Sequence, residues 1–152
     1  MMSPTGGEHG SIVASVTAPL TLFVKQHGLG RIYGAETGFQ IARDPDTVRA
    51  PDVGFVAAAR MGAKPSRGFV PGPPDLAVEV VSPNDRAGEV LAKVFDWLDA
   101  GCRAVWVVDP PTRTVTVYRS REQIVTLGPD DELTGDDVVP GFRLPVAEIF
   151  AD

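Results

Sequence analysis

The chain has 152 residues, enough for one domain with a sizeable hydrophobic core. Its 14 basic and 20 acidic side chains give a net charge of −6, which argues against a protein that binds nucleic acid through bulk positive charge alone. One cysteine excludes an intramolecular disulfide and a multi-cysteine zinc site, and no apolar run is long enough for a membrane span. The N-terminus lacks a secretory signal pattern, so we expect a cytoplasmic location and no membrane partner.

The first predicted element is a helix over residues 8–27. Residues 1–7, which are small and polar, are expected to be disordered before it. Pro19 lies inside the helix and predicts a kink or a division into two shorter helices, and Gly28 is a suitable end. Apolar residues recur at helical spacing and predict one buried stripe, which consists of Ile12, Val16, Leu20 and Phe23 with Val13 and Val24.

Short strands are predicted next, because apolar and β-branched residues alternate between turn signals. The first two cover residues 31–33 and 38–42, and a third covers residues 51–57. Residues 59–73 are rich in glycine, proline and basic residues, so this segment is predicted to be a surface loop. A buried strand over residues 76–81 follows it.

A second helix is predicted over residues 86–100. Asn84 or Asp85 is expected to cap its N-terminus, and Gly101 is expected to close it. The next segment, residues 103–108, is a continuous apolar run, which is typical of a strand buried on both faces.

The remaining chain predicts an antiparallel meander. The strand over residues 103–108 forms a hairpin with residues 114–119, residues 123–127 extend it, and residues 146–150 dock as a helical turn. We therefore predict a single domain over residues 8–152, of the mixed α/β (α+β) class, with a central mixed sheet flanked by helices.

Charged residues at three of these elements suggest a site. Alternation along the strand at 76–81 places Asp75 and Glu79 on one face, and buried charges are costly unless they are paired or bound to metal. A neighbouring strand can bring Asp52 within reach of the same Mg²⁺ or Mn²⁺ ion as Glu79. Lys93 borders the buried face of the second helix, where its amine can orient or deprotonate a water that attacks a phosphodiester.

Each candidate also has a purely structural interpretation. Asp52 and Asp75 follow prolines at strand starts, where aspartate commonly caps a turn. Glu79 can be buried against an arginine or exposed at a sheet edge, and Lys93 can be a surface lysine. Glu8 is a weaker candidate for a further acidic ligand. The remaining chemically notable residues are assigned to solvent (His9 and His27) or to the core (Trp97, Cys102 and Trp106).

Several motifs together resemble one family. They are Arg49–Val53 (RAPDV), Pro74–Pro83 (PDLAVEVVSP), Lys93 and Val105–Pro110 (VWVVDP), in this order. They are similar to motifs of the Uma-two family, bacterial nucleases that resemble restriction endonucleases and belong to the PD-(D/E)XK superfamily. The resemblance covers the chain from about residue 8 to the C-terminus. It implies a restriction-endonuclease-like core and Mg²⁺- or Mn²⁺-dependent hydrolysis of DNA.

The resemblance also implies roles for individual residues. Asp52 matches the first metal-binding aspartate, and Glu79 matches the acidic residue of the second half-motif. The lysine expected two residues after that acid is absent, because position 81 is a valine. Lys93 matches a lysine that the family carries on the following helix instead.

Further parts of the family pattern match less closely. Glu8 resembles an acid that superfamily members often carry on the first helix, and Asp75 matches a recurrent aspartate that supports the site or the fold. Family members usually begin with an additional acidic strand pair, which this sequence is expected to lack, and an open sheet edge would favour a homodimer. Two hypotheses follow: a metal-dependent DNA endonuclease, or a non-catalytic nuclease-fold protein that serves as a regulatory or binding module.

Overall fold

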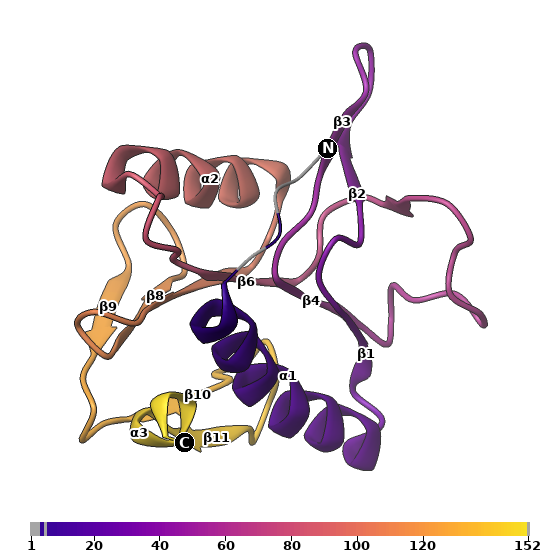
Figure 1. Ribbon diagram of the computed structural model, residues 1–152. Helices are drawn as coiled ribbons and strands as arrows, with labels where there is room; N and C mark the ends of the chain where they lie inside the picture. Colours follow the sequence, from indigo (N-terminus) through magenta and orange to yellow (C-terminus); the bar gives the residue numbers. More distant parts are fainter. Residues whose placement is uncertain (1–3, 5, 152) are drawn as a thin grey trace.

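The computed structural model describes residue 4 and residues 6–151, which form a six-stranded mixed sheet with helices on both faces (Figure 1). The expectation of disorder for residues 1–7 falls mostly outside the described residues, and Gly7 already belongs to a helix. The helices are α1 (Gly7–His27), α2 (Ala87–Ala100) and α3 (Val146–Phe150). No helix in this described part of the chain has the length and apolar character needed to cross a membrane.

The main sheet has the strand order β1-β4-β6-β7-β8-β9. Only β6 and β7 run parallel, because α2 connects them as a crossover, whereas the other neighbours are antiparallel. The mixed sheet predicted from the sequence is therefore confirmed. Its strands are β1 (Gly30–Tyr33), β4 (Val53–Ala57), β6 (Leu76–Val80), β7 (Ala104–Asp109), β8 (Thr114–Tyr118) and β9 (Ile124–Leu127).

Two small sheets extend this core. Strand β2 (Phe39–Ala42) pairs with β3 (Thr47–Arg49) and with β5 (Val70–Pro71), and these strands lie beyond one end of β4 (Figure 1). Strand β10 (Glu132–Thr134) pairs with β11 (Arg143–Pro145) beneath the main sheet. The sequence did not predict β3, β5, β10 or β11, because these strands are only two or three residues long.

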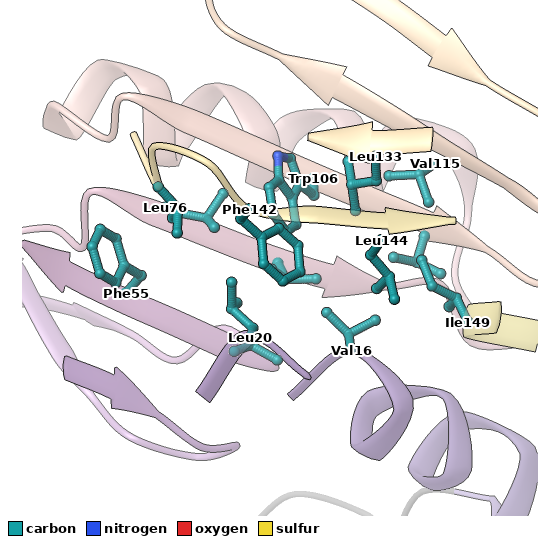
Figure 2. Packing of buried hydrophobic residues seen from close by; sticks show 14 of the residues in the cluster. Val16, Leu20, Phe55, Leu76, Trp106, Val115, Leu133, Phe142, Leu144 and Ile149 are labelled. Atoms are coloured by element: carbon teal, nitrogen blue, oxygen red, sulfur yellow. The ribbon is translucent and has the colours of Figure 1, made fainter. Parts of the chain in front are cut away.

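The larger hydrophobic core lies between one face of the sheet and the layer formed by α1, β10, β11 and α3. Figure 2 shows Val16 and Leu20 of α1 opposite Phe55 and Leu76 of the sheet. The predicted stripe on α1 is confirmed, since Ile12, Val16, Leu20 and Val24 are its buried residues. The helix is one unbroken element through Pro19, so the alternative of two shorter helices is wrong.

The second core lies on the opposite face of the sheet, under α2. Trp97 packs there edge-to-face on Phe39 of the small sheet, with ring centroids 6.4 Å apart. Cys102 is part of this core, as predicted, and burial raises the pKa of its thiol to about 12. Trp106 is buried too, but in the core on the α1 side.

A glycine ends each of the two long helices, α1 and α2, at its C-terminus. Gly28 and Gly101 close α1 and α2 in the left-handed conformation, with φ angles of 61° and 110°. The predicted N-terminal cap of α2 is wrong, because Arg86 occupies the cap position and provides no side-chain hydrogen bond. The carboxylate of Asp85 accepts a hydrogen bond from the amide of Ser82 instead, which tightens the turn between β6 and α2.

Candidate active site

A pocket of about 190 Å³ lies where β4 begins, β6 ends and the first turns of α1 and α2 meet the sheet. The antiparallel register that pairs Val53 with Val78 brings Asp52 alongside Glu79, one position further along. The predicted residues Asp52, Glu79 and Lys93 all line this pocket, together with His9 and Asp85. Residues far apart in the sequence thus converge on one concave surface.

Glu79 is the most buried charged group in the pocket, with only 9% of the residue exposed. Its Oε2 atom accepts a hydrogen bond of 3.0 Å from the indole nitrogen of Trp97 on α2. Burial raises the pKa of the carboxyl from 4.5 to about 7, the Asp52 carboxylate also raises it, and the Trp97 bond and the Lys93 charge lower it. Glu79 is therefore a poorly compensated acid at neutral pH.

Asp52 lies on the segment that leads into β4. Its Oδ2 atom accepts a hydrogen bond of 2.8 Å from the amide of Val80, so the carboxylate spans the gap between the two strands. The same oxygen lies 3.4 Å from Nε2 of His9 on α1. The side chain is 22% exposed, so Asp52 is held by the protein while remaining open to the pocket.

Lys93 and Asp85 complete the rim of the pocket. Lys93 is exposed on α2, and its charge acts on the Glu79 carboxylate. Asp85 lies in the turn before α2, and its negative charge opposes that of Lys93 in its effect on Glu79. The pocket therefore joins three carboxylates to one ammonium group.

The other two predicted residues lie elsewhere. Asp75 precedes β6, at the opposite end of the strand from the pocket, and its carboxylate accepts hydrogen bonds from the Ala57 amide (2.7 Å) and the Arg60 guanidinium (3.0 Å). Glu8 is exposed and lines a different pocket, beside Arg113 and the C-terminal helix. The structure thus gives Asp75 a role in holding the fold and does not bring Glu8 to the other acids.

The donors of the pocket suit a hard divalent cation in type, because Mg²⁺ binds one or two carboxylates and keeps several waters. Within the described residues, the chain engages only one oxygen of each carboxylate, Oδ2 of Asp52 and Oε2 of Glu79. A cation beside Glu79 would offset the cost of ionising it. No cluster of three or more His, Cys, Asp or Glu side chains is close enough to enclose a metal in the described ranges, so the fit is to an open site with few protein ligands.

Sequence reasoning missed three residues of this site. The expectation that His9 faces solvent is wrong, since its side chain is 10% exposed and contacts β6, whereas His27 is exposed as expected. His9 precedes Ile12 by three residues, so extending the apolar stripe of α1 by one turn would have found it. Trp97 was assigned to the core only, and Asp85 to a helix cap.

The central mixed sheet with helices on both faces defines a mixed α/β fold, in which acidic residues lie at the ends of neighbouring strands. A structure with the same fold supports this class: a crystal structure of a protein described as a "putative nuclease belonging to DUF820" from Anabaena variabilis superposes with a TM-score of 0.82. The match covers 99% of this chain and 84% of that chain at 21% sequence identity, so it establishes the fold.

The family follows from the sequence comparison. The model of the Uma2 family, described as "putative restriction endonuclease", matches residues 1–147. The chain belongs to this family, which confirms the resemblance seen in the sequence motifs. A search of curated proteins finds no match.

Proposed function

We propose that this protein is a Mg²⁺- or Mn²⁺-dependent endonuclease that hydrolyses phosphodiester bonds of DNA at the pocket formed by Asp52, Glu79 and Lys93. The observation that carries the proposal is the convergence of these three side chains, from three separate segments of the chain, on one pocket. The nuclease fold and the membership of the Uma2 family support it.

The roles of the residues follow from their surroundings. Asp52 and Glu79 are the proposed ligands, and a bound cation supplies positive charge for the phosphate and lowers the pKa of a coordinated water. Trp97 fixes the orientation of Glu79 through its indole bond, and the Val80 amide does the same for Asp52. Lys93 carries an exposed cationic group on the rim, suited to orient the attacking water or to neutralise charge on the phosphate.

The acidic total does not argue against a phosphodiester substrate at the pocket, because the excess of acidic side chains lies in one part of the chain. Residues 1–93 carry nine basic and nine acidic side chains, whereas residues 94–152 carry five basic and eleven acidic ones. The net charge of −6 therefore comes from the C-terminal part of the chain. Arg49, before Asp52, and Arg86, at the start of α2, are half exposed or more on segments that flank the pocket and can contact the phosphate backbone.

A cleavage assay with matched variants tests the proposal. A supercoiled plasmid is incubated with protein and Mn²⁺, and wild type is compared with Glu79→Gln and Lys93→Met. We expect each variant to cleave on the order of 10²–10⁴-fold more slowly, the range for loss of a positioned catalytic group. The controls are Glu148→Gln and Lys25→Met, which change the same residue types at exposed helix positions outside the pocket. Cleavage by the pocket variants at the wild-type rate would sink the assignment.

A second candidate function is a non-catalytic, nuclease-fold module that binds DNA or protein. It is favoured by the lack of a three-residue metal cluster in the described part of the chain. Calorimetric titration with Mn²⁺ separates the two functions. The endonuclease binds Mn²⁺ and loses binding in Glu79→Gln, whereas a module without a metal site shows no heat of binding at millimolar Mn²⁺ and no cleavage.

A further inference from the structure

The side chain of His9 joins three parts of the pocket. Its Nε2 atom lies 3.0 Å from the Val80 carbonyl oxygen and 3.4 Å from Oδ2 of Asp52. The Val80 amide in turn donates to that same Asp52 oxygen at 2.8 Å. His9, Val80 and Asp52 thus form a closed set of contacts that connects α1 to the start of β4 and the end of β6.

The Val80 carbonyl determines that Nε2 of His9 carries a hydrogen. A carbonyl oxygen can only accept a hydrogen bond, so Nε2 of His9 carries the hydrogen that points at Val80. The positive end of this N–H dipole also faces the Asp52 carboxylate, which favours its present position. The ring is nearly buried, with 10% of the side chain exposed, so water competes weakly for these contacts.

Anchoring of α1 does not require this contact. The helix is already fixed by its buried stripe of Ile12, Val16, Leu20 and Val24 against the sheet. His9 lies one turn before the stripe and faces the pocket. An apolar residue there would continue the stripe, whereas the imidazole places a polar N–H against the two strand ends that carry Glu79 and Asp52.

We propose that His9 is a positioning residue, which holds the Asp52 carboxylate and the end of β6 in the arrangement that the pocket needs. The inference rests on the proposed function in one respect: Asp52 and Glu79 are taken as the metal-binding acids. Asp52 lies outside β4: its amide bonds to the Val78 carbonyl at 3.1 Å, but the pairing with β1 on the other side ends at Gly54, so the His9 contact adds a restraint on the Asp52 side chain. Outer partners of metal ligands typically contribute about 10–100-fold to metal affinity or activity.

Three variants test the proposal. His9→Ala removes the N–H, and His9→Gln retains it, because the glutamine amide reaches the place of Nε2 and can donate to the Val80 carbonyl. His27→Ala is the matched control, since His27 lies at the far end of the same helix, is exposed, and bonds only to the Phe23 carbonyl of its own helix. Thermal unfolding shows whether each variant is folded.

The first measurement needs neither metal nor DNA. Hydrogen exchange of the Val80 amide, followed by NMR, reports directly on its bond to Asp52. We expect exchange about five- to tenfold faster in His9→Ala, the effect of weakening one hydrogen bond, and near wild type in His9→Gln and His27→Ala. Wild-type exchange in a folded His9→Ala protein would overturn the proposal.

The second measurement concerns activity. We expect His9→Ala to lower kcat and the Mn²⁺ affinity by about 10–100-fold with a smaller change in the KM for DNA, and His9→Gln to restore most of the loss. A folded His9→Gln protein as impaired as His9→Ala would overturn the positioning role, because the imidazole itself would then be required. If His9→Ala does not fold, His9→Leu takes its place in both measurements, because leucine fills the space but has no N–H to donate to the Val80 carbonyl. Failure of the proposed function shows separately, as wild-type cleavage by Glu79→Gln.

Discussion

Two buried carboxylates lie at opposite ends of β6, and their surroundings differ. Asp75 is 4% exposed and accepts hydrogen bonds from a backbone amide and from the guanidinium of Arg60. Glu79 is 9% exposed, and its side chain accepts a hydrogen bond from the neutral indole of Trp97, with an ammonium group only at the rim of the pocket. One strand thus carries a satisfied acid and a poorly compensated one.

The difference distinguishes a structural acid from a candidate functional one. A buried carboxylate that accepts hydrogen bonds from an arginine and a backbone amide stabilises the local fold. Its negative charge is already balanced, so it attracts an added cation only weakly. A buried carboxylate whose pKa is raised to about 7 is destabilised in its ionised form, and a nearby positive charge would stabilise that form. In this protein the second acid lies in the pocket and the first does not.

The largest expected difference between the two acids is in how each makes the free energy of unfolding depend on pH, and it comes from Glu79. In metal-free protein the folded state holds a proton on Glu79 that the unfolded chain releases above pH 4.5. Stability contributed by this group is therefore full below about pH 4.5 and falls until about pH 7, by about 3 kcal/mol in total.

Urea denaturation across this pH range, with a chelator present, measures the effect. Glu79→Gln keeps the acceptor for the Trp97 indole but has no proton to lose. The difference between wild type and this variant should grow from pH 4.5 to pH 7 and then stay constant. Parallel pH profiles for the two proteins would show that Glu79 is not a poorly compensated acid.

The next effect concerns the satisfied acid. Asp75→Ala leaves the Ala57 amide without its acceptor and the Arg60 guanidinium without its ion pair, so we expect a loss of about 2–3 kcal/mol in the free energy of unfolding. The measurement is the urea midpoint at neutral pH. Asp96→Ala, which breaks an exposed pair with Arg49 at 3.8 Å, is the control and should cost less than about 1 kcal/mol. Equal losses in both variants would remove the structural role of Asp75.

The smallest expected effect comes from Trp97→Phe. Loss of the indole bond raises the pKa of Glu79 further and removes a contribution of about 1 kcal/mol, measured as the excess over the packing loss in Trp106→Phe. Mn²⁺ binding, which needs the ionised carboxylate, should then require a higher pH. Trp106→Phe makes the same change in the other core and should leave the pH dependence of Mn²⁺ binding as it is in wild type.

The sequence was sufficient to predict the fold because the pattern of strands and helices is strongly periodic. The apolar run at 104–108 and the stripe of α1 are unambiguous, and the meander after β7 follows from its turns. The family motifs then placed Asp52, Glu79 and Lys93 together, and the structure does bring them to one pocket.

The remaining details depend on contacts between distant segments. The bond of Trp97 to Glu79 and the contact of His9 with Val80 are set by how the two helices dock, which spacing along the chain does not specify. The cap at Asp85 was predicted from local preference, and the turn before α2 used that carboxylate differently. The roles of Asp52, Glu79 and Lys93 in metal binding and catalysis stay predictions.

The contact between His9 and Val80 has a consequence for the order in which the protein becomes active. It joins residues at the start of the chain to a strand in its middle, so a ribosome must synthesise α1 long before its partner strand exists. Contacts of such long range form late in folding, after local turns and helices. Under the proposed roles, a nascent or partly unfolded chain in which α1 is not docked lacks the His9 contact, and we expect it to cleave DNA more slowly than the folded protein.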